Sequence, residues 1–212
     1  MAIFFQHSIN DFTKLGIWKI EEQEPFFLEN VPLKQQVTHP YKRLQHLAGR
    51  LLLPVLFADF PLEEILIADT RKPFLEDEKY HFSISHCGNF AAAIASSTNR
   101  VGADIELVTP RLKSIAHKFL TEKENAYLDR WKELTALYLQ MLTIIWSSKE
   151  AIFKWYGLGK VDFRKHMELD GVIVFEADEW ITVPFIFKKE EPVQIKVMAK
   201  TFDSLVMAFV VT

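Results

Sequence analysis

The chain has almost no thiol chemistry, because Cys87 is its single cysteine. That excludes an internal disulfide framework and fits a reducing compartment. It also lacks a charge excess of either sign: 25 basic and 28 acidic residues give a net charge of −3. No global feature therefore indicates nucleic-acid binding or a polybasic membrane anchor. An anionic ligand must be bound by a local cluster of basic residues.

Long uninterrupted apolar runs are absent as well. The most apolar stretch, residues 47–68, is broken by two prolines and several charged residues, so it does not qualify as a membrane span. The first twelve residues have no basic region ahead of their apolar ones, which a secretory signal would need. We therefore expect a cytoplasmic protein with no membrane partner.

The chain does contain enough apolar material for a sizeable core. Hydrophobic residues make up 49% of its 212 residues and aromatic residues 13%, so it is neither disordered nor fibrous. Such a length admits one large domain or two small ones.

Strand and helix patterns are interspersed along the chain. We expect helices over residues 40–52, 121–128 and 134–154, and a short Glu-rich helix before residue 30. Residues 71–73 read as an extended turn, because the residue before a proline avoids the α region. We expect strands near residues 3–5, 16–20, 65–68, 80–85, 89–96, 100–108, 167–176, 180–187, 193–200 and 205–211.

Two hairpins in this pattern resemble each other. Residues 81–96 and 194–211 each form two apolar strands, and each hairpin closes a half of about a hundred residues. Either duplication of one half of the chain or chance similarity between apolar strands would explain the resemblance of the two hairpins. Residues 80–108 as a whole read as a three-stranded meander, in which His86, Cys87 and Gly88 form the first turn.

An acidic pair follows in the strand predicted over residues 100–108. Asp104 and Glu106 alternate with apolar residues, so their side chains share one face of the strand. Many half-exposed strands have such a solvated face, and the spacing alone does not separate that interpretation from a binding site.

A second charged cluster lies on the helix predicted over residues 134–154. Trp146, Glu150 and Lys154 are spaced by four residues and therefore stack on one face. Lys149 and Glu150 could also form a surface stripe on this helix, with Glu150 and Lys154 as an ordinary i, i+4 pair. The surrounding segment is so apolar, however, that these charges must lie at a boundary, where a carboxylate needs a cation. Three carboxylates and a lysine indicate Mg²⁺ near a phosphate.

Other chemistry is less well supported. Ser83, Ser85 and His86 raise the possibility of a serine hydrolase, but neither serine lies in a Gly-x-Ser-x-Gly elbow. His86 is equally well explained as a turn residue. One cysteine and scattered histidines do not have the spacing of a zinc site. Glu124, three residues after Thr121, is explained by a capping box as readily as by a catalytic role.

Five segments, taken in order, resemble the motifs of the 4′-phosphopantetheinyl transferases. They are Arg71-Lys72-Pro73, Phe82-Ser83-Ile84-Ser85-His86-Cys87, Gly102-Ala103-Asp104-Ile105-Glu106, Phe119-Leu120-Thr121-Glu122-Lys123-Glu124, and the nine residues from Trp146 to Lys154. The length resembles the surfactin-synthetase-activating type, which is monomeric. The resemblance implies an α+β fold of two similar lobes, each with a small antiparallel sheet packed on helices in a pseudo-twofold arrangement. We place the lobes at residues 1–108 and 109–212, with the ligands in the cleft between them.

The resemblance also implies a reaction. The 4′-phosphopantetheine group of coenzyme A would be transferred to a serine of an apo acyl or peptidyl carrier protein, releasing adenosine 3′,5′-bisphosphate. Asp104, Glu106 and Glu150 would hold Mg²⁺ against the coenzyme A pyrophosphate. Glu150, or Glu124 through a water, would act as the general base, and Lys154 would stabilise or protonate the leaving phosphate.

The remaining matches are implied to bind the nucleotide end of coenzyme A. We expect these residues to be Arg71, Lys72, Ser85 and His86, together with Arg43, His46 and Arg50 on the helix at residues 40–52. Trp146 is expected to pack the helix. Two positions depart from the family pattern: Cys87 stands where a serine is usual, and Ala103 where valine or isoleucine is usual.

Two further functions remain open from the sequence. One is a catalytically silent coenzyme A or nucleotide-binding module with the same fold, and the other is a Mg²⁺-dependent phosphoesterase. Joint retention of Asp104, Glu106, Glu150 and Lys154 argues against the silent module. The identity of the carrier protein depends on surface complementarity that the sequence does not reveal.

Overall fold

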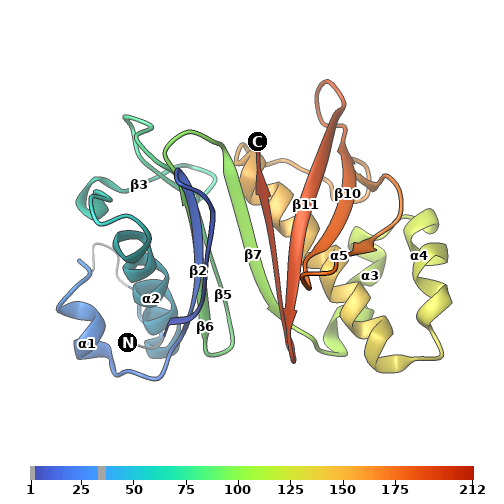
Figure 1. The fold of residues 1–212 in the computed structure, drawn as a ribbon, viewed down its shortest axis with the longest axis horizontal. Helices are drawn as coiled ribbons and strands as arrows, with labels where there is room; N and C mark the ends of the chain where they lie inside the picture. Colours follow the sequence, from blue (N-terminus) through green and yellow to red (C-terminus); the bar gives the residue numbers. More distant parts are fainter. Residues whose placement is uncertain (1–2, 33–36) are drawn as a thin grey trace. The chain divides into compact units, whose positions relative to one another are not determined.

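The structure is a computed structural model that describes residues 3–32 and 37–212. The chain divides into two compact units (Figure 1). The first runs to Ile105 and includes Val211–Thr212, and the second is Glu106–Val210. The division falls inside strand β7 (Val101–Leu107). Both units combine antiparallel strands with helices, so the chain has the α+β class that we expected.

The first unit is built on a four-stranded antiparallel sheet in the order β1-β2-β6-β5. Its strands are β1 (Ile3–Asn10), β2 (Thr13–Lys19), β5 (His81–Cys87) and β6 (Phe90–Ser96). A short hairpin of β3 (Leu66–Ile67) and β4 (Pro73–Phe74) carries the turn at residues 68–72. The expected short strand is therefore present, whereas Arg71 in the expected extended turn is left-handed, with φ 65°.

One long helix, α2 (Pro40–Leu56), packs against β2, β5 and β6 of this sheet (Figure 1). Proline at its first position suits a helix start, because that N–H would have no partner within the helix. The short helix α1 (Glu24–Leu28) packs against it. Gly49 permits the close approach to β5, since a Cβ there would lie 2.5 Å from Cγ2 of Ile84.

Two expectations for this unit were wrong. Strand β6 pairs with β2 on one side and β5 on the other, so residues 80–108 are not a meander. Strand β5 also continues through His86 and Cys87, and Gly88 and Asn89 form the loop. His86 is thus a strand residue, because a two-residue hairpin loop with Gly88 at φ 50° is sufficient here.

The second unit contains the strands β8 (Met167–Leu169), β9 (Val174–Phe175), β10 (Ile181–Phe187), β11 (Val193–Phe202) and β12 (Leu205–Val211). They run in the order β12-β11-β10-β8, and β9 also pairs with β10. The alternating burial of β10 shows a sheet with one face in the core. The β11–β12 hairpin has a two-residue loop with Asp203 at φ 48°, as the β5–β6 hairpin has with Gly88.

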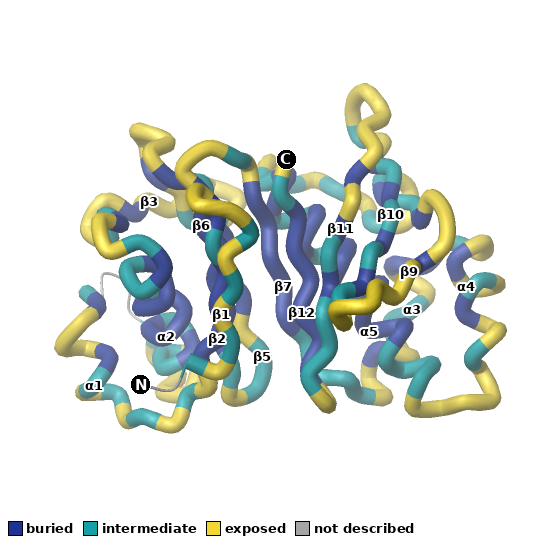
Figure 2. Tube along the Cα trace, viewed as in Figure 1, coloured by how far each residue is buried: buried dark blue, intermediate teal, exposed yellow. Residues whose placement is uncertain are grey.

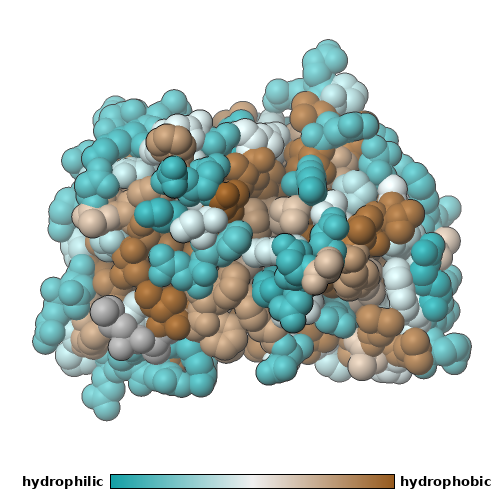
Figure 3. All heavy atoms as spheres, viewed as in Figure 1, coloured by the Kyte–Doolittle hydropathy of each residue, from teal (hydrophilic) through white to brown (hydrophobic). Residues whose placement is uncertain are grey.

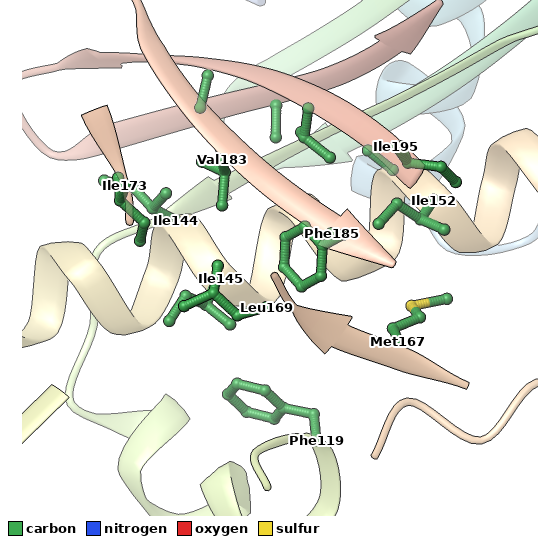
Figure 4. Close-up of a cluster of buried hydrophobic side chains, with 14 of the residues drawn as sticks. Phe119, Ile144, Ile145, Ile152, Met167, Leu169, Ile173, Val183, Phe185 and Ile195 are labelled. Carbon is green, nitrogen blue, oxygen red and sulfur yellow. The ribbon is translucent and has the colours of Figure 1, made fainter. Parts of the chain in front are cut away.

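Helix α5 (Thr135–Tyr156) packs against β11 and is longer than we expected. It ends at Gly157, whose φ of 75° is the left-handed conformation that commonly ends helices. Figure 4 shows Ile144, Ile145 and Ile152 of α5 packed with Val183, Phe185 and Ile195 of the sheet. In Figure 2, β12 is buried along most of its length, whereas buried and less buried positions alternate on β10.

Two shorter helices complete this unit. Helix α4 (Glu122–Leu128) begins with the predicted capping box, since both reciprocal bonds between Thr121 and Glu124 are present. Helix α3 (Arg111–Phe119) was not predicted, because its mostly polar sequence buries only Leu112 and Phe119.

The surface in Figure 3 mixes hydrophilic and apolar side chains. Large apolar residues are exposed at scattered places such as Leu158 and Phe175, which is ordinary for a folded protein. None of the helices within residues 3–32 and 37–212 is long and apolar enough to cross a membrane.

Candidate active site

Asp104 lies in the first unit beside two serines of β5. The Ser85 hydroxyl donates a hydrogen bond of 2.7 Å to Oδ1 of Asp104. Ser83 accepts from the Ala103 N–H at 3.1 Å and donates to the Ala103 carbonyl at 3.4 Å. All three side chains of this group, Ser83, Ser85 and Asp104, are buried. The serines thus anchor β7 and orient the carboxylate.

Glu106 follows two residues later on β7, so its side chain shares a strand face with Asp104. Within the second unit, the indole N–H of Trp146 donates to Oε1 of Glu106 at 3.4 Å. The sequence predicted only packing for Trp146. The structure adds a polar contact that connects the end of β7 to helix α5.

The helix face beyond Trp146 carries Glu150 and Lys154, each one turn further along α5. Both side chains are half-buried, as expected for charges at the edge of an apolar helix. Trp146 therefore places Glu106 next to the face that bears Glu150. Asp104, on the other side of the division in β7, belongs to the first unit.

These carboxylates fit a hard divalent cation in chemical kind, because Mg²⁺ prefers oxygen ligands. Hydrogen bonds from outer residues commonly orient such ligands, as Ser85 and Trp146 do here. Within the described residues, no three Asp, Glu, His or Cys side chains already form a metal-binding group. The magnesium site therefore stays a prediction.

Glu124 is completely buried in the second unit. Oε2 accepts from the Thr121 N–H at 2.8 Å and from Nζ of Lys149 at 2.8 Å. Oε1 accepts from the Leu169 N–H at 3.0 Å. Its side chain is 0% exposed, so these contacts favour the structural interpretation of Glu124 over that of a general base.

The first unit collects cationic groups that the sequence assigned to nucleotide binding. His46 and Arg50 are one turn apart on α2, with 3.0 Å between Nδ1 and Nη1. Burial lowers the pKa of His46 to about 4, and Arg50 and His86 contribute to the decrease. Burial also lowers the pKa of Arg50. A bound anion would favour the protonated form of His46, which is otherwise neutral near pH 7.

Lys72 has a similar environment just before β4. Burial lowers the pKa of Lys72 to about 8, and the nearby Arg100 adds to the effect. Its neighbour Arg71 is exposed in the turn with φ 65°. Arg100 was not among the predicted site residues, and only its position just before β7 could have suggested it.

Arg43 has other partners. Its guanidinium forms an ion pair of 2.8 Å with Glu24 and donates to the Val37 carbonyl at 3.1 Å. These bonds connect α2 to α1 and to the segment before α2. The structure therefore gives Arg43 a structural role in addition to the predicted phosphate contact.

Several of the residues described above lie in a segment that matches a known protein family. The family model of the 4′-phosphopantetheinyl transferase superfamily matches residues 100–210, which include the acidic pair on β7 and all of α5. This match covers more than half of the chain. The chain therefore belongs to the 4′-phosphopantetheinyl transferase superfamily.

Several characterised proteins are similar to the chain. The 4′-phosphopantetheinyl transferase AcpT of Escherichia coli is 34% identical over 128 residues, which cover 59% of this chain and 64% of that protein. The L-aminoadipate-semialdehyde dehydrogenase-phosphopantetheinyl transferase of Xenopus laevis is 32% identical over 135 residues, covering 53% and 43%. Enterobactin synthase component D of Escherichia coli is 28% identical over 116 residues, covering 53% and 54%. The chain thus spans less than two thirds of the length of these relatives.

Proposed function

We propose that the protein transfers the 4′-phosphopantetheine group of coenzyme A to a serine of an apo acyl or peptidyl carrier protein. The observation that carries this proposal is the superfamily match over residues 100–210, which contains Asp104, Glu106, Glu150 and Lys154 together. Relatives named as phosphopantetheinyl transferases support the same reaction.

The cationic groups of the first unit support binding of the nucleotide end of coenzyme A. His46, Arg50 and His86 lie close enough that their charges oppose the protonation of His46. Lys72 and Arg100 form a second such pair. A phosphate near these groups would favour their charged forms, and desolvation would strengthen the attraction.

Asp104, Glu106 and Glu150 would hold the Mg²⁺ on which we expect the reaction to depend. A divalent ion at a pyrophosphate neutralises charge that develops on the phosphoryl oxygens. The protein's own contribution is to orient the carboxylates, through Ser85 for Asp104 and Trp146 for Glu106.

Glu150 and Lys154 would carry the proton and charge changes of the transfer. Glu150 would accept the proton of the carrier serine as its oxygen attacks the β-phosphorus of coenzyme A. The bond from that phosphorus to the bridging oxygen breaks, and adenosine 3′,5′-bisphosphate leaves with the bond's electron pair. Lys154, one turn beyond Glu150, would stabilise the leaving phosphate.

The proposal is tested by mixing the protein with coenzyme A, Mg²⁺ and a panel of purified apo carrier proteins. The carriers are then weighed by mass spectrometry. We expect at least one to gain a single phosphopantetheine on its serine, and reactions without metal or coenzyme A to show no gain. Binding of coenzyme A with no modified carrier in the panel would favour the silent module instead. Release of phosphate without transfer would favour the phosphoesterase.

A further inference from the structure

Lys149, immediately before Glu150, is a fully buried cation. Its side chain is 0% exposed, and so is that of its partner Glu124, 2.8 Å away. Nζ also lies within hydrogen-bond distance of three backbone carbonyls, those of Phe119 at 2.7 Å, Phe163 at 3.1 Å and Met167 at 3.0 Å. Helix α5 points this ammonium away from solvent, toward segments that are distant in sequence.

These acceptors belong to four different segments of the second unit. Phe119 ends α3, Glu124 lies in the first turn of α4, Phe163 lies in the loop after α5, and Met167 begins β8. Glu124 extends the connection to Leu169 through its other oxygen. A single side chain of α5 therefore connects four segments at its ammonium group.

The two phenylalanines held in this way lie against the same residue. The ring centroids of Phe119 and Trp146 are 4.9 Å apart, and those of Phe163 and Trp146 are 5.7 Å apart. Trp146 in turn donates its indole N–H to Glu106. Movement of either backbone segment would move the rings that hold Trp146, and with them the donor to Glu106.

Stability alone does not explain this arrangement. Removing an ammonium and a carboxylate from water is costly, and a buried ion pair often gives no more stability than apolar residues of similar size. A buried pair of this kind is better explained by the geometry that it imposes.

We infer that Lys149 is a positioning residue for the proposed transfer: it holds Phe119 and Phe163 around Trp146 and thereby orients Glu106. The expected effect of Lys149 on catalysis rests on the proposed function. The structural part of the inference, which links Lys149 to Trp146, is independent of the proposed function.

The test uses the double variant Glu124→Gln/Lys149→Met of the full chain. It removes both charges, so neither is left buried alone, and glutamine is still suited to a capping box. The matched control is Ile152→Ala, which also alters a fully buried residue of α5 but lies among Phe185 and Ile195 (Figure 4). Both proteins are first compared with the parent in thermal unfolding, and all later measurements are made below both unfolding transitions.

The first readout is the ¹⁹F spectrum of protein labelled with 5-fluorotryptophan, with the Trp146 signal assigned from Trp146→Phe. We expect this signal to shift or broaden in the double variant and to stay in place in Ile152→Ala. An unchanged Trp146 signal in the double variant would overturn the inference, whether or not a carrier has been found.

The second readout is transfer to a carrier that the parent modifies. We expect kcat to fall between about 10-fold and 100-fold in the double variant, because small displacements of reacting groups have effects of this size. KM for coenzyme A should change less than about twofold, since the residues expected to bind its nucleotide end lie in the first unit. An equal loss of kcat in Ile152→Ala would show that Lys149 has only a structural role. If the parent transfers nothing, the proposed function fails while the ¹⁹F result still decides the structural part.

Discussion

The Ser85 hydroxyl donates a 2.7 Å hydrogen bond to the carboxylate of Asp104, and both side chains are buried. The sequence motif alone assigned Ser85 to the nucleotide. The structure adds a hydrogen bond from Ser85 to an expected metal ligand. The two residues therefore act together, because Ser85 fixes the rotamer of Asp104 before any cation binds.

Ser85→Ala should therefore weaken the use of magnesium. We expect the Mg²⁺ concentration for half-maximal transfer to rise by about tenfold, because loss of an orienting hydrogen bond typically reduces metal affinity by that factor or more. Titration of activity with Mg²⁺ measures it, and the exposed Ser97→Ala is the control. A Ser85→Ala protein with the parent's magnesium dependence but weaker coenzyme A binding would return Ser85 to the nucleotide.

Glu150→Gln should abolish most of the transfer while leaving the fold intact. Loss of a general base commonly lowers kcat by about 10²- to 10⁴-fold, and the substitution keeps the side chain's size. Single-turnover assays and circular dichroism together measure the effect, with the exposed Glu133→Gln as the control. Near-normal turnover would remove Glu150 from its assigned role.

Coenzyme A binding should weaken as the pH rises above about 8. The pKa of Lys72 is about 8 in the free protein, and a phosphate beside it favours the charged form. Binding then requires proton uptake above this pH, so affinity falls by up to about tenfold per pH unit. Calorimetric titrations between pH 7 and 10 test this, and Lys72→Met should bind more weakly with a flatter pH profile. Equal slopes for the two proteins would contradict the assignment.

The free protein should lose stability in weak acid through His46. Its folded pKa of about 4 lies below the ordinary value near 6.5, so the unfolded chain binds more protons between these values. Stability is therefore fully present above about pH 6.5 and falls as the pH decreases toward 4. We expect His46→Gln to reduce this loss by roughly 1–2 kcal/mol, after allowance for partial exposure. Urea unfolding at pH 4.5 and 7 measures it. A pH dependence of stability that His46→Gln leaves unchanged would exclude His46 as its source.

Gly49→Ala should destabilise the first unit. The added Cβ would lie 2.5 Å from Cγ2 of Ile84, a β-branched side chain that has little freedom on a strand. Overpacking of this kind costs about 1–3 kcal/mol in the free energy of unfolding. Denaturant titration measures the loss, and Ile84→Ala in the same chain should recover part of it. Additive losses in the double variant would argue against this contact.

Local signals predicted much of the fold. The capping box of α4 and the four-residue spacing on α5 depend on neighbours in sequence, and both were predicted correctly. The pairing of β2 with β6 was not predicted, because it joins residues that are more than seventy positions apart in the sequence. Helix α3 was missed because its short sequence has only two buried apolar residues.

The candidate site shows the same difference between local patterns, which the sequence reveals, and contacts between distant segments, which it does not. Residue types and order indicated Asp104, Glu106 and Glu150, whereas the contacts that orient them join distant segments. No sequence pattern could pair Ser85 with Asp104 or Lys149 with the carbonyl of Phe163. The sequence placed Lys149 on a surface stripe or at the boundary of its apolar helix, and this was wrong, because the side chain is 0% exposed.

The boundary between the units passes between the two acidic residues of β7. Only Ile105 separates the two side chains along the strand. An ion held by both carboxylates would bind only when β7 is folded from Asp104 to Glu106, so by mass action it would oppose the unfolding of this strand. Magnesium bound in this way should therefore raise the temperature at which the protein unfolds.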